Sequence, residues 1–412
     1  MRIGIDISTL LNHGHDIGAG RYIYNLLKGL FELETKENSN NITTQNKFQN
    51  KLNEGNKSKK DTFILTARYT TDDYTPILTS LIERYSEAKI KLRLYRVTPK
   101  KLNLWNRFGF PPIEFRGFKA DLLHCPDFLI PPTLNKNIIL TIHDLAFIRF
   151  PQFNFDWFIK KYTKEVKKNA LRAKKIIAVS NSTKNDIISF FGIEPGKIEV
   201  IYEAVDEVFK KLEQNEIRKE ILGKYNIKGK YILSVGTIEP RKNFPTLIKA
   251  FNLVKEKVKE KIKDLKLVIA GRTGWKSEAT YEEREKSPYK EDILFIGRVS
   301  DEDLCQLYNQ AELFVYPSIF EGFGLPPLEA MRCGLPVIAS DCPSLKEVVG
   351  DAGILISSND FEAISENVIK LLLDNNLREK LKEKSLSQAK KFSWEKTAIK
   401  TLNTYRNILQ YM

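Results

Sequence analysis

Two glutamates with glycines between them are the residues of this 412-residue chain whose types and spacing most directly suggest chemistry. Glu321 and Glu329 stand eight positions apart, and Gly322-Phe323-Gly324-Leu325 follows the first of them. An apolar run at 313–316 predicts a strand before this segment, and the prolines at 326–327 suit the first turn of a helix. Amides at a helix N-terminus bind anions, and carboxylates accept hydrogen bonds from hydroxyls. The segment therefore predicts a site for a ligand with phosphates and sugar hydroxyls, although two solvated glutamates beside an ordinary helix are the alternative.

A basic pair ahead of another helix would complete such a site. A predicted strand at 231–235 ends at Gly236, and Arg241 and Lys242 stand just before a helix that we expect to begin near Asn243. Guanidinium and ammonium groups beside a helix N-terminus bind a diphosphate. A solvated surface pair is the alternative interpretation.

Three further glycine-containing segments follow predicted strands, at the sheet edge where parallel sheets bind their ligands. Glycine lets backbone amides approach a ligand closely, although a simple tight turn explains each segment equally well. The candidate residues in these segments are Gly18, Gly20, Gly271, Gly297, Arg298 and Val299.

A histidine and an aspartate follow the apolar strand predicted at 138–142. Placed at this edge of the sheet, His143 is a candidate for contact with a ligand. A structural histidine bonded to a backbone carbonyl is the alternative. Asp144 either orients His143 or caps the turn that follows.

The acidic run Asp301-Glu302-Asp303 resembles a D-x-D metal site, but its surroundings favour a helix start. Ser300 precedes it, and apolar residues follow at helical spacing. Acidic residues in the first turn of a helix complement the helix dipole behind an N-cap. We therefore predict no metal here.

Length and composition indicate two domains with ordinary hydrophobic cores. A chain of 412 residues exceeds what one core supports, and 42% of the residues are hydrophobic. Its four cysteines and four histidines have no metal-binding spacing, so we expect a reduced, cytoplasmic protein without structural zinc. The first residues predict a strand rather than a signal peptide, and no apolar run reaches membrane-spanning length.

The formal net charge of +14 predicts an anionic partner, which is nucleic acid, phospholipid or a phosphorylated substrate. Residues 149–175 hold nine basic and two acidic residues, half of the surplus, with four aromatic residues gathered at one end. Such a segment fits an anionic membrane surface, and residues 105–110 would extend that surface. Alternatively, the aromatic side chains belong to the core and the lysines form a solvated face.

Strands alternate with helices along the chain, and the alternation restarts after Asp206. This pattern predicts an α/β protein with two Rossmann-like, doubly wound domains, 1–205 and 206–393, and a cleft between them. Residues 34–60, rich in Asn and Lys, are predicted to form a disordered insertion in the first domain. Strands are expected at 2–7, 62–66, 91–97, 121–124, 138–142, 175–179, 199–202, 231–235, 267–270, 293–296, 313–316 and 337–339.

The segment P-S-x-x-E-G-F-G-L-P-x-L-E-A-M-x-x-G-x-P-V around Glu321 and Glu329 resembles the hallmark E-x7-E block of the retaining glycosyltransferases of family 4. The segments G-x-x-E-P-R-K-N around Arg241 and T-I-H-D around His143 match the same family, so the resemblance covers nearly the whole chain outside the insertion. It implies the GT-B fold, with an acceptor-binding N-terminal domain and a C-terminal domain that binds a nucleotide sugar. It also implies that a C-terminal helix at 394–412 packs back on the first domain.

The resemblance implies roles for the candidate residues. Glu321 and the amides after it would hold sugar hydroxyls, and Glu329 would bind the ribose. Arg241 and Lys242 would stabilise the departing diphosphate, so no divalent metal or other cofactor is expected. The implied catalytic residues are His143, Arg241, Lys242 and Glu321. The implied donor-binding residues are Gly18, Gly20, Gly236, Arg241, Lys242, Gly271, Arg298, Val299, Glu321, Gly322, Phe323, Gly324, Leu325 and Glu329.

These segments are most similar to bacterial mannosyltransferases that use GDP-mannose in the synthesis of surface polysaccharides, including lipopolysaccharide. We therefore predict a retaining glycosyltransferase that transfers mannose to a saccharide or lipid-linked acceptor, in the cytoplasm or peripherally on the inner face of the membrane. One alternative is a UDP-sugar-dependent enzyme that uses glucose or N-acetylglucosamine. Another is a non-catalytic basic protein that binds nucleic acid or serves as a scaffold, although no RNA-binding motif appears. Glu203 in Y-E-A-V-D departs from the family's frequent N-G-V-D on the acceptor side.

Overall fold

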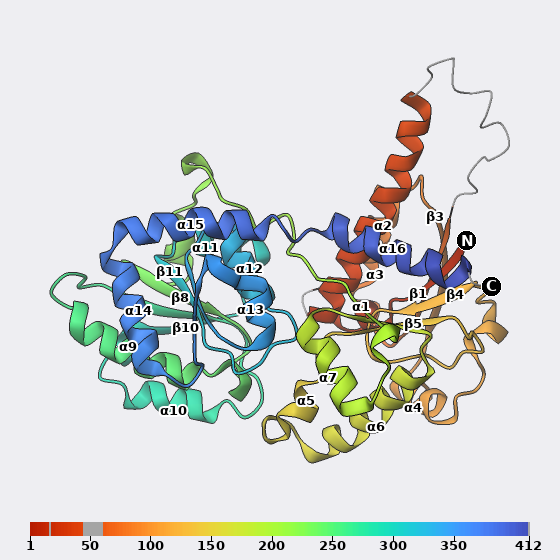
Figure 1. Cartoon of the computed structure of the whole chain (residues 1–412), viewed down its shortest axis with the longest axis horizontal. Coiled ribbons are helices and arrows are strands. Elements are labelled where there is room, and N and C mark those ends of the chain that lie inside the picture. The colour runs from red at the N-terminus through yellow and green to blue at the C-terminus, as the bar shows by residue number, and fades with distance from the viewer. Residues whose placement is uncertain (16–17, 44–60, 411–412) are drawn as a thin grey trace.

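Two parallel β-sheets, each surrounded by helices, lie side by side in the computed structural model, which describes residues 1–15, 18–43 and 61–410 (Figure 1). The first sheet has the strand order β3-β2-β1-β4-β5-β6-β7, and all its pairs are parallel. The predicted two-domain α/β architecture is confirmed. The strands of this sheet are β1 (Arg2–Asp6), β2 (Thr62–Tyr69), β3 (Lys89–Arg96), β4 (Leu122–Cys125), β5 (Ile138–Ile142), β6 (Lys175–Ala178) and β7 (Ile198–Val200).

The second sheet has the order β10-β9-β8-β11-β12-β13 and is also parallel throughout. Its last strand was not predicted, because three apolar residues after a glycine are too short to show a pattern. The last strand of the first sheet begins and ends earlier than the predicted 199–202. The strands of the second sheet are β8 (Tyr231–Val235), β9 (Lys266–Ala270), β10 (Ile293–Gly297), β11 (Leu313–Tyr316), β12 (Val337–Ser340) and β13 (Ile354–Ile356).

The central strands are predominantly apolar because helices cover both faces of such a sheet. Every residue of β5, β11 and β12 is buried. The helices are α1 (Ser8–His13), α2 (Gly18–Thr43), α3 (Thr75–Arg84), α4 (Pro99–Phe108), α5 (Ala146–Arg149), α6 (Asp156–Arg172), α7 (Asn181–Phe191), α8 (Glu220–Lys224), α9 (Phe244–Val258), α10 (Glu278–Lys286), α11 (Asp301–Gln310), α12 (Leu325–Arg332), α13 (Pro343–Val349), α14 (Phe361–Leu373), α15 (Asn375–Ala389) and α16 (Trp394–Gln410).

The predicted disordered insertion at 34–60 is wrong for its first part. Helix α2 continues to Thr43 and projects from the first domain in Figure 1. Polar residues such as Glu, Lys and Asn do not prevent helix formation, so the loss of apolar periodicity did not mark the end of the helix. Residues 44–60 lie outside the described part of the chain.

The C-terminal helix α16 crosses from the second domain to the first and packs against α2. Its buried face includes Ala398, Leu402 and Tyr405, which join the hydrophobic core of the first domain. The Tyr405 hydroxyl lies 2.6 Å from His124 Nδ1 in the interior of that domain. The two domains are therefore joined by this helix as well as by the chain that follows β7.

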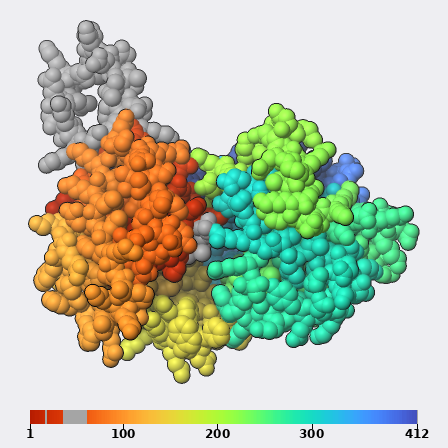
Figure 2. Space-filling view, turned by 180° about the vertical axis from the view of Figure 1, so that it is seen from behind, coloured from red at the N-terminus to blue at the C-terminus, as the bar shows by residue number. Residues whose placement is uncertain are grey.

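A hollow separates the two domains in the space-filling view of Figure 2, between the orange N-terminal and the cyan C-terminal parts. The loops that follow β5 and β8, and the loop between β11 and α12, border the cavity in this region. These loops carry the candidate residues of the sequence motifs. No helix among the described residues is long and apolar enough to cross a membrane.

Candidate functional site

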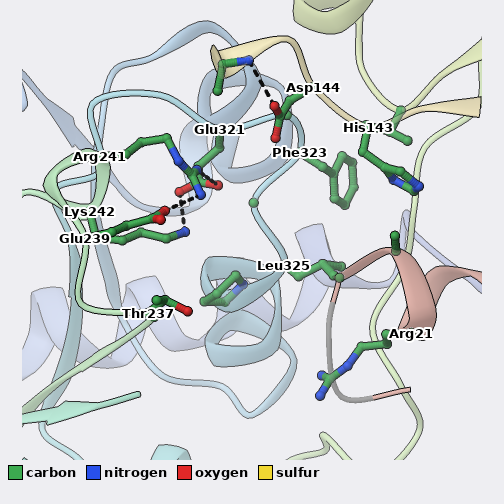
Figure 3. Close-up of a pocket in the computed structure, with 18 of the residues that line it drawn as sticks. Arg21, His143, Asp144, Thr237, Glu239, Arg241, Lys242, Glu321, Phe323 and Leu325 are labelled. Carbon is green, nitrogen blue, oxygen red and sulfur yellow. Dashed lines mark hydrogen bonds and ion pairs between the residues drawn. The ribbon is translucent and has the colours of Figure 1, made fainter. Parts of the chain in front are cut away.

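A cavity of about 680 Å³ lies between the two domains, and both domains contribute to its walls. In Figure 3, Arg241, Lys242 and Glu321 lie on the side of the C-terminal domain, and Arg21 and His143 lie on the opposite side. We call these two sides the C-terminal wall and the N-terminal wall. A ligand between them contacts both domains.

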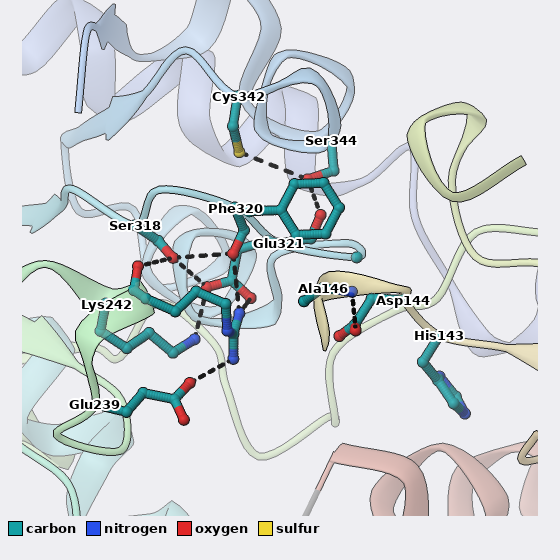
Figure 4. A network of polar contacts seen from close by, with 12 residues as sticks. His143, Asp144, Ala146, Glu239, Lys242, Ser318, Phe320, Glu321, Cys342 and Ser344 are labelled. Carbon is teal, nitrogen blue, oxygen red and sulfur yellow. Dashed lines mark hydrogen bonds and ion pairs between the residues drawn. The ribbon is translucent and has the colours of Figure 1, made fainter. Parts of the chain in front are cut away.

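Glu321 is the centre of the C-terminal wall. Its carboxylate accepts hydrogen bonds from Arg241 Nη1 at 2.7 Å and from Lys242 Nζ at 2.6 Å. The hydroxyls of Tyr316 and Ser318 donate to it at 2.8 and 2.6 Å. Figure 4 shows the part of this network around Lys242, Ser318 and Glu321. The strand β11 and the short 3-10 turn at Pro240–Lys242 place these groups together from two separate strand ends.

The two cations keep Glu321 ionised although it is buried. Burial raises the pKa of this carboxyl, but the charges of Arg241 and Lys242 outweigh burial and bring the pKa down to about 2. Burial opposes the charge of Arg241 in the same way, yet Glu321 and Glu239 raise the pKa of its guanidinium. Glu321 and Arg241 are therefore ionised at neutral pH, whereas burial lowers the pKa of Lys242 and the charge of Glu321 opposes that change in part.

Glu239 is a second carboxylate of this wall. It accepts a hydrogen bond from Arg241 Nη2 at 2.7 Å and is 2% exposed. Its other oxygen, Oε2, is buried without a hydrogen-bond partner among the described residues. Two cations and two carboxylates thus nearly balance, so an anionic ligand would also need the backbone amides nearby.

Those amides belong to the segment after Glu321. No hydrogen bond within the described chain uses the amides of Phe323, Gly324 or Leu325, which precede or begin helix α12. Gly324 has φ of +115°, a conformation that favours glycine. Gly322 packs so closely on the first domain that a Cβ would lie 2.0 Å from the carbonyl oxygen of His143. The glycines are therefore needed both for the turn and for the approach of the two domains.

Glu329 lies one helix turn further, and a residue from the opposite wall reaches it. Arg21 Nη1 donates to Glu329 Oε1 at 3.0 Å, and Arg21 Nη2 donates to Asp301 Oδ1 at 2.7 Å. The Tyr308 hydroxyl donates to Glu329 Oε2 at 3.0 Å. Burial raises the pKa of Glu329, and the nearby Arg21 charge opposes that rise only in part. The surroundings of Glu329 therefore raise its pKa, whereas those of Glu321 lower its pKa.

His143 lies on the N-terminal wall with both ring nitrogens occupied by protein groups. Nδ1 is 2.8 Å from Glu203 Oε1, and Nε2 is 3.1 Å from the carbonyl oxygen of Pro126. Burial lowers the pKa of the imidazole, but the hydrogen bond and charge of Glu203 raise it to about 9. His143 is therefore an imidazolium that donates from both nitrogens, and Glu203, the residue that departs from the family pattern, supplies its counter-charge.

The remaining predicted residues divide between two adjoining cavities. Gly18 and Gly236 line both the interdomain cavity and a neighbouring one of about 750 Å³. The neighbouring cavity is where Gly271, Arg298 and Val299 lie. Gly20 lines neither, because helix α2 already begins at Gly18 and turns Gly20 into the interior.

The helix-start interpretation of Asp301-Glu302-Asp303 is confirmed. Helix α11 begins at Asp301, and the Ser300 side chain accepts a hydrogen bond from Asp303 N. Asp303 pairs with Lys224 at 2.5 Å, and Asp301 pairs with Arg21. Asp301 and Asp303 thus have positively charged side chains as partners.

Sequence reasoning missed several residues that the fold brings to these walls. Arg21 directly follows Gly20, and only the glycines of that segment were candidates. No local signal links Arg21 to Glu329, which is 308 positions away. Glu203 was noted only as a departure from the family pattern. Tyr316 ended an apolar strand and Glu239 stood inside the segment G-x-x-E-P-R-K-N, and neither had a feature that distinguished it as a site residue. Asp144, left open between two roles, caps the following turn by accepting a hydrogen bond from Ala146 N at 2.9 Å.

Two family models match the chain. The model described as "Glycosyltransferase Family 4" matches residues 78–209, and the model "Glycosyl transferases group 1" matches residues 198–388. Together they include His143, Arg241, Lys242 and Glu321, whereas Arg21 precedes the matched residues.

The chain is also similar to two O-antigen mannosyltransferases. The chain is 35% identical over 316 residues to the O-antigen chain mannosyltransferase B of Escherichia coli, which covers 76% of this chain and 80% of that protein. It is 32% identical over 232 residues to the O-antigen chain mannosyltransferase RfbU of Salmonella typhimurium, which covers 55% of this chain and 58% of that protein.

Solved structures support the fold. The sucrose-phosphate synthase of Thermosynechococcus elongatus superposes with a TM-score of 0.71 at 17% identity and covers 100% of both chains. WaaG, described as a glycosyltransferase involved in lipopolysaccharide biosynthesis, superposes with a TM-score of 0.66 at 15% identity, over 97% of this chain and 98% of that chain. The predicted two-domain fold is therefore confirmed.

Proposed function

We propose that this chain, which belongs to the glycosyltransferases of family 4, transfers mannose from GDP-mannose to a saccharide or lipid-linked saccharide and retains the anomeric configuration. It is a glycosyltransferase whose relatives are named mannosyltransferases of O-antigen synthesis, and surface polysaccharide is the corresponding product class. The experiment described below tests the donor nucleotide and the configuration of the product.

The observation that carries the proposal is the charged C-terminal wall. Arg241 and Lys242 are held by Glu321 beside the free amides that begin α12. Cations and amides fixed in a partly buried cleft stabilise developing negative charge without reorganisation. A diphosphate leaving group develops such charge, and the glutamate oxygens accept hydrogen bonds from sugar hydroxyls.

In this scheme the donor is held mainly by the C-terminal wall. The C-terminal wall holds the donor: Arg241 and Lys242 contact the diphosphate, Glu321 contacts the sugar, and Glu329 contacts the ribose. Because Arg21 now occupies Glu329 Oε1, the ribose must share or displace that hydrogen bond. The cavity lined by Gly271, Arg298 and Val299 lies next to this position and would receive the base.

The transfer itself needs no protein nucleophile. The acceptor hydroxyl oxygen bonds to the anomeric carbon while the bond from that carbon to the diphosphate oxygen breaks. The hydroxyl proton passes to the departing phosphate oxygen on the same face of the sugar. The charge that develops on the diphosphate lies beside Arg241 and Lys242, so these residues and the α12 amides would lower the barrier in place of a divalent metal.

The purified chain with GDP-mannose and mannose oligosaccharides tests the proposal. Mass spectrometry should show addition of one hexose, and NMR should show an α-mannoside, the retained configuration. UDP-glucose and UDP-N-acetylglucosamine serve as competing donors. Transfer from a UDP-sugar alone, or a β-linked product, would contradict the proposal. Tight RNA binding with no binding of any nucleotide sugar would favour the non-catalytic alternative.

We further propose that the first domain docks on anionic membrane. In the basic segment 149–175, Phe158 packs on the core, but Phe155 and Trp157 are 48% and 64% exposed. Phe108 and Phe110, near the end of α4, are also exposed. Exposed aromatic residues beside lysines bind the interface of anionic bilayers. Flotation with vesicles of anionic lipid should carry the chain upward. A Trp157→Ala, Phe108→Ala variant should float less, and a wild-type chain that stays at the bottom would disprove the docking.

A further inference from the structure

Part of the interdomain cavity is lined by residues that have no assigned contact with the donor. It is lined by Asp144 after β5, by Asn154, by Phe158 in the first turn of α6, and by Trp275 after β9. We call these four residues the cleft mouth. None of them was singled out as a candidate binding residue in the sequence. Three come from the first domain and one from the second, so the mouth exists only where the two domains meet.

The carboxylate of the mouth has a hydrogen-bonding position to spare. Asp144 Oδ1 accepts from Ala146 N, which fixes the side chain. Oδ2 has no hydrogen-bond partner within the described chain, and it is not among the buried unsatisfied atoms. In Figure 4 the Asp144 carboxylate lies on the side of Asp144 that faces the Glu321 network. The charge of Asp144 raises the pKa of Arg241. This oxygen therefore faces the place where the donor sugar would lie.

The aromatic part of the mouth is held in a fixed orientation. Trp275 Nε1 donates to the carbonyl oxygen of Phe153 at 2.7 Å. The next residue, Lys276, donates to the carbonyl oxygens of Gln152 and Asn154 at 2.8 and 2.9 Å. The indole is nevertheless 40% exposed, so its ring remains accessible after its only donor is used.

Phe158 is the second aromatic residue of the cleft mouth. Its ring lies edge-on to Phe147, with centroids 5.8 Å apart and planes at 89°, and 4.4 Å from the ring of Tyr162. These neighbours keep it in one position. Fixed rings lose little entropy when a ligand binds.

A saccharide matches this arrangement. Sugar rings present apolar C–H faces that pack on aromatic rings, and hydroxyls that donate to carboxylates. Pockets of this kind combine apolar walls with a few placed polar groups.

We propose that the cleft mouth is the acceptor subsite: the terminal sugar of a saccharide acceptor lies against Trp275 and Phe158 and donates a hydroxyl hydrogen bond to Asp144. This inference rests on the proposed function and adds the residues that recognise the acceptor. Trp275 and Asp144 then determine the acceptor KM, and the C-terminal wall determines donor affinity.

The test uses the full chain, GDP-mannose and a soluble mannotriose as the acceptor probe. Trp275→Ala should raise the KM for mannotriose about tenfold, and Asp144→Asn, which can keep the bond to Ala146 N, should raise it to a similar extent. The Kd for GDP-mannose, measured by calorimetry without acceptor, should change less than about twofold in both variants. Trp275→Phe, which keeps an aromatic face, should recover part of the KM.

Phe115→Ala is the matched control, because Phe115 is a 66% exposed aromatic residue outside the cavity, and its acceptor KM should equal that of the wild type. An unchanged acceptor KM in Trp275→Ala and Asp144→Asn would overturn the subsite. A loss of GDP-mannose affinity in these variants as large as the rise in acceptor KM would also overturn it. A loss of vesicle binding without a change in the KM for mannotriose would show instead that the mouth contacts the bilayer. Failure of the wild type to bind GDP-mannose is a different outcome and would contradict the proposed function instead.

Discussion

The two walls of the cleft are assembled in different ways. On the C-terminal wall, Arg241 and Lys242 contact Glu321 within a single domain. On the N-terminal wall, Arg21 is held by Glu329 and Asp301 of the other domain. The contacts of Arg241 and Lys242 with Glu321 are therefore made without the first domain, whereas the position of Arg21 depends on closure. Donor binding should accordingly be a property of one domain, and turnover a property of both.

The largest effect should come from the C-terminal wall. Lys242→Met removes a buried ammonium that donates to Glu321 and Tyr316. Losing one such electrostatic contact costs about 10²–10³ in kcat. Steady-state rates with GDP-mannose check this, and a kcat within about threefold of the wild type would show that Lys242 is not part of the reaction.

Lys255→Met is the matched control, since Lys255 is also a buried lysine of the same domain. It pairs with Asp292 at 2.8 Å, away from the cleft. Its loss should lower the melting temperature but leave kcat of the folded enzyme unchanged.

An intermediate effect is expected for Arg21→Gln on the opposite wall. The variant loses the pairs with Glu329 and Asp301 that link the two domains, so the closed arrangement should be less populated. Truncating one partner of a buried pair costs about 2–5 kcal/mol, and we expect at least a tenfold loss in kcat. Small-angle scattering should show a larger radius of gyration.

Lys28→Gln provides the comparison for Arg21→Gln. Lys28 lies on the same helix, and its partner Glu207 is 71% exposed. An exposed pair contributes little, so kcat and the radius of gyration should stay at wild-type values. Equal losses in both variants would contradict the role of Arg21.

A smaller effect, on stability and not primarily on rate, is expected at Glu203. The pKa of His143 is raised to about 9 by this carboxylate, above the usual value near 6.5. The pair therefore stabilises the fold fully below about pH 6.5, and this stabilisation is lost as pH rises through about 9. Glu203→Gln should lower the melting temperature at pH 6 and change it little at pH 10.

NMR titration of the His143 ring gives the direct readout of the same pair. Its pKa should fall toward the usual value in Glu203→Gln. A constant difference in melting temperature between pH 6 and pH 10, or an unshifted His143 pKa, would rule out the pairing.

The smallest effect is expected from metal removal. If Arg241, Lys242 and the α12 amides stabilise the leaving diphosphate, EDTA should leave the rate within about twofold of its value in magnesium. A rate that falls with EDTA and recovers with Mg²⁺ or Mn²⁺ would show that the C-terminal wall is insufficient by itself.

The C-terminal wall was predictable because each of its parts stands beside a strand end within a short segment. Glu321 and Arg241 follow β11 and β8, which are adjacent in the sheet, so parallel pairing brings them together. The N-terminal wall was not predictable in the same way. Arg21 and Glu329 meet only through the arrangement of two domains, and Glu203 finds His143 across the sheet edge of the first domain.

Sequence also failed where composition misled. The end of α2 was missed because solvated helices can lack an apolar stripe, and β13 was missed because it is three residues long. Trp275 ends the glycine-containing segment at 271–275, but nothing in that segment indicated its hydrogen bond to a carbonyl oxygen of the other domain.

Calorimetric titration of GDP-mannose into the wild type, Lys242→Met and Arg21→Gln tests the central claim most directly. The account predicts binding to the wild type, at least a tenfold weaker Kd in Lys242→Met, and a Kd within about threefold of the wild type in Arg21→Gln. Equal affinity of Lys242→Met and the wild type, or binding of UDP-sugars in place of GDP-mannose, would contradict it.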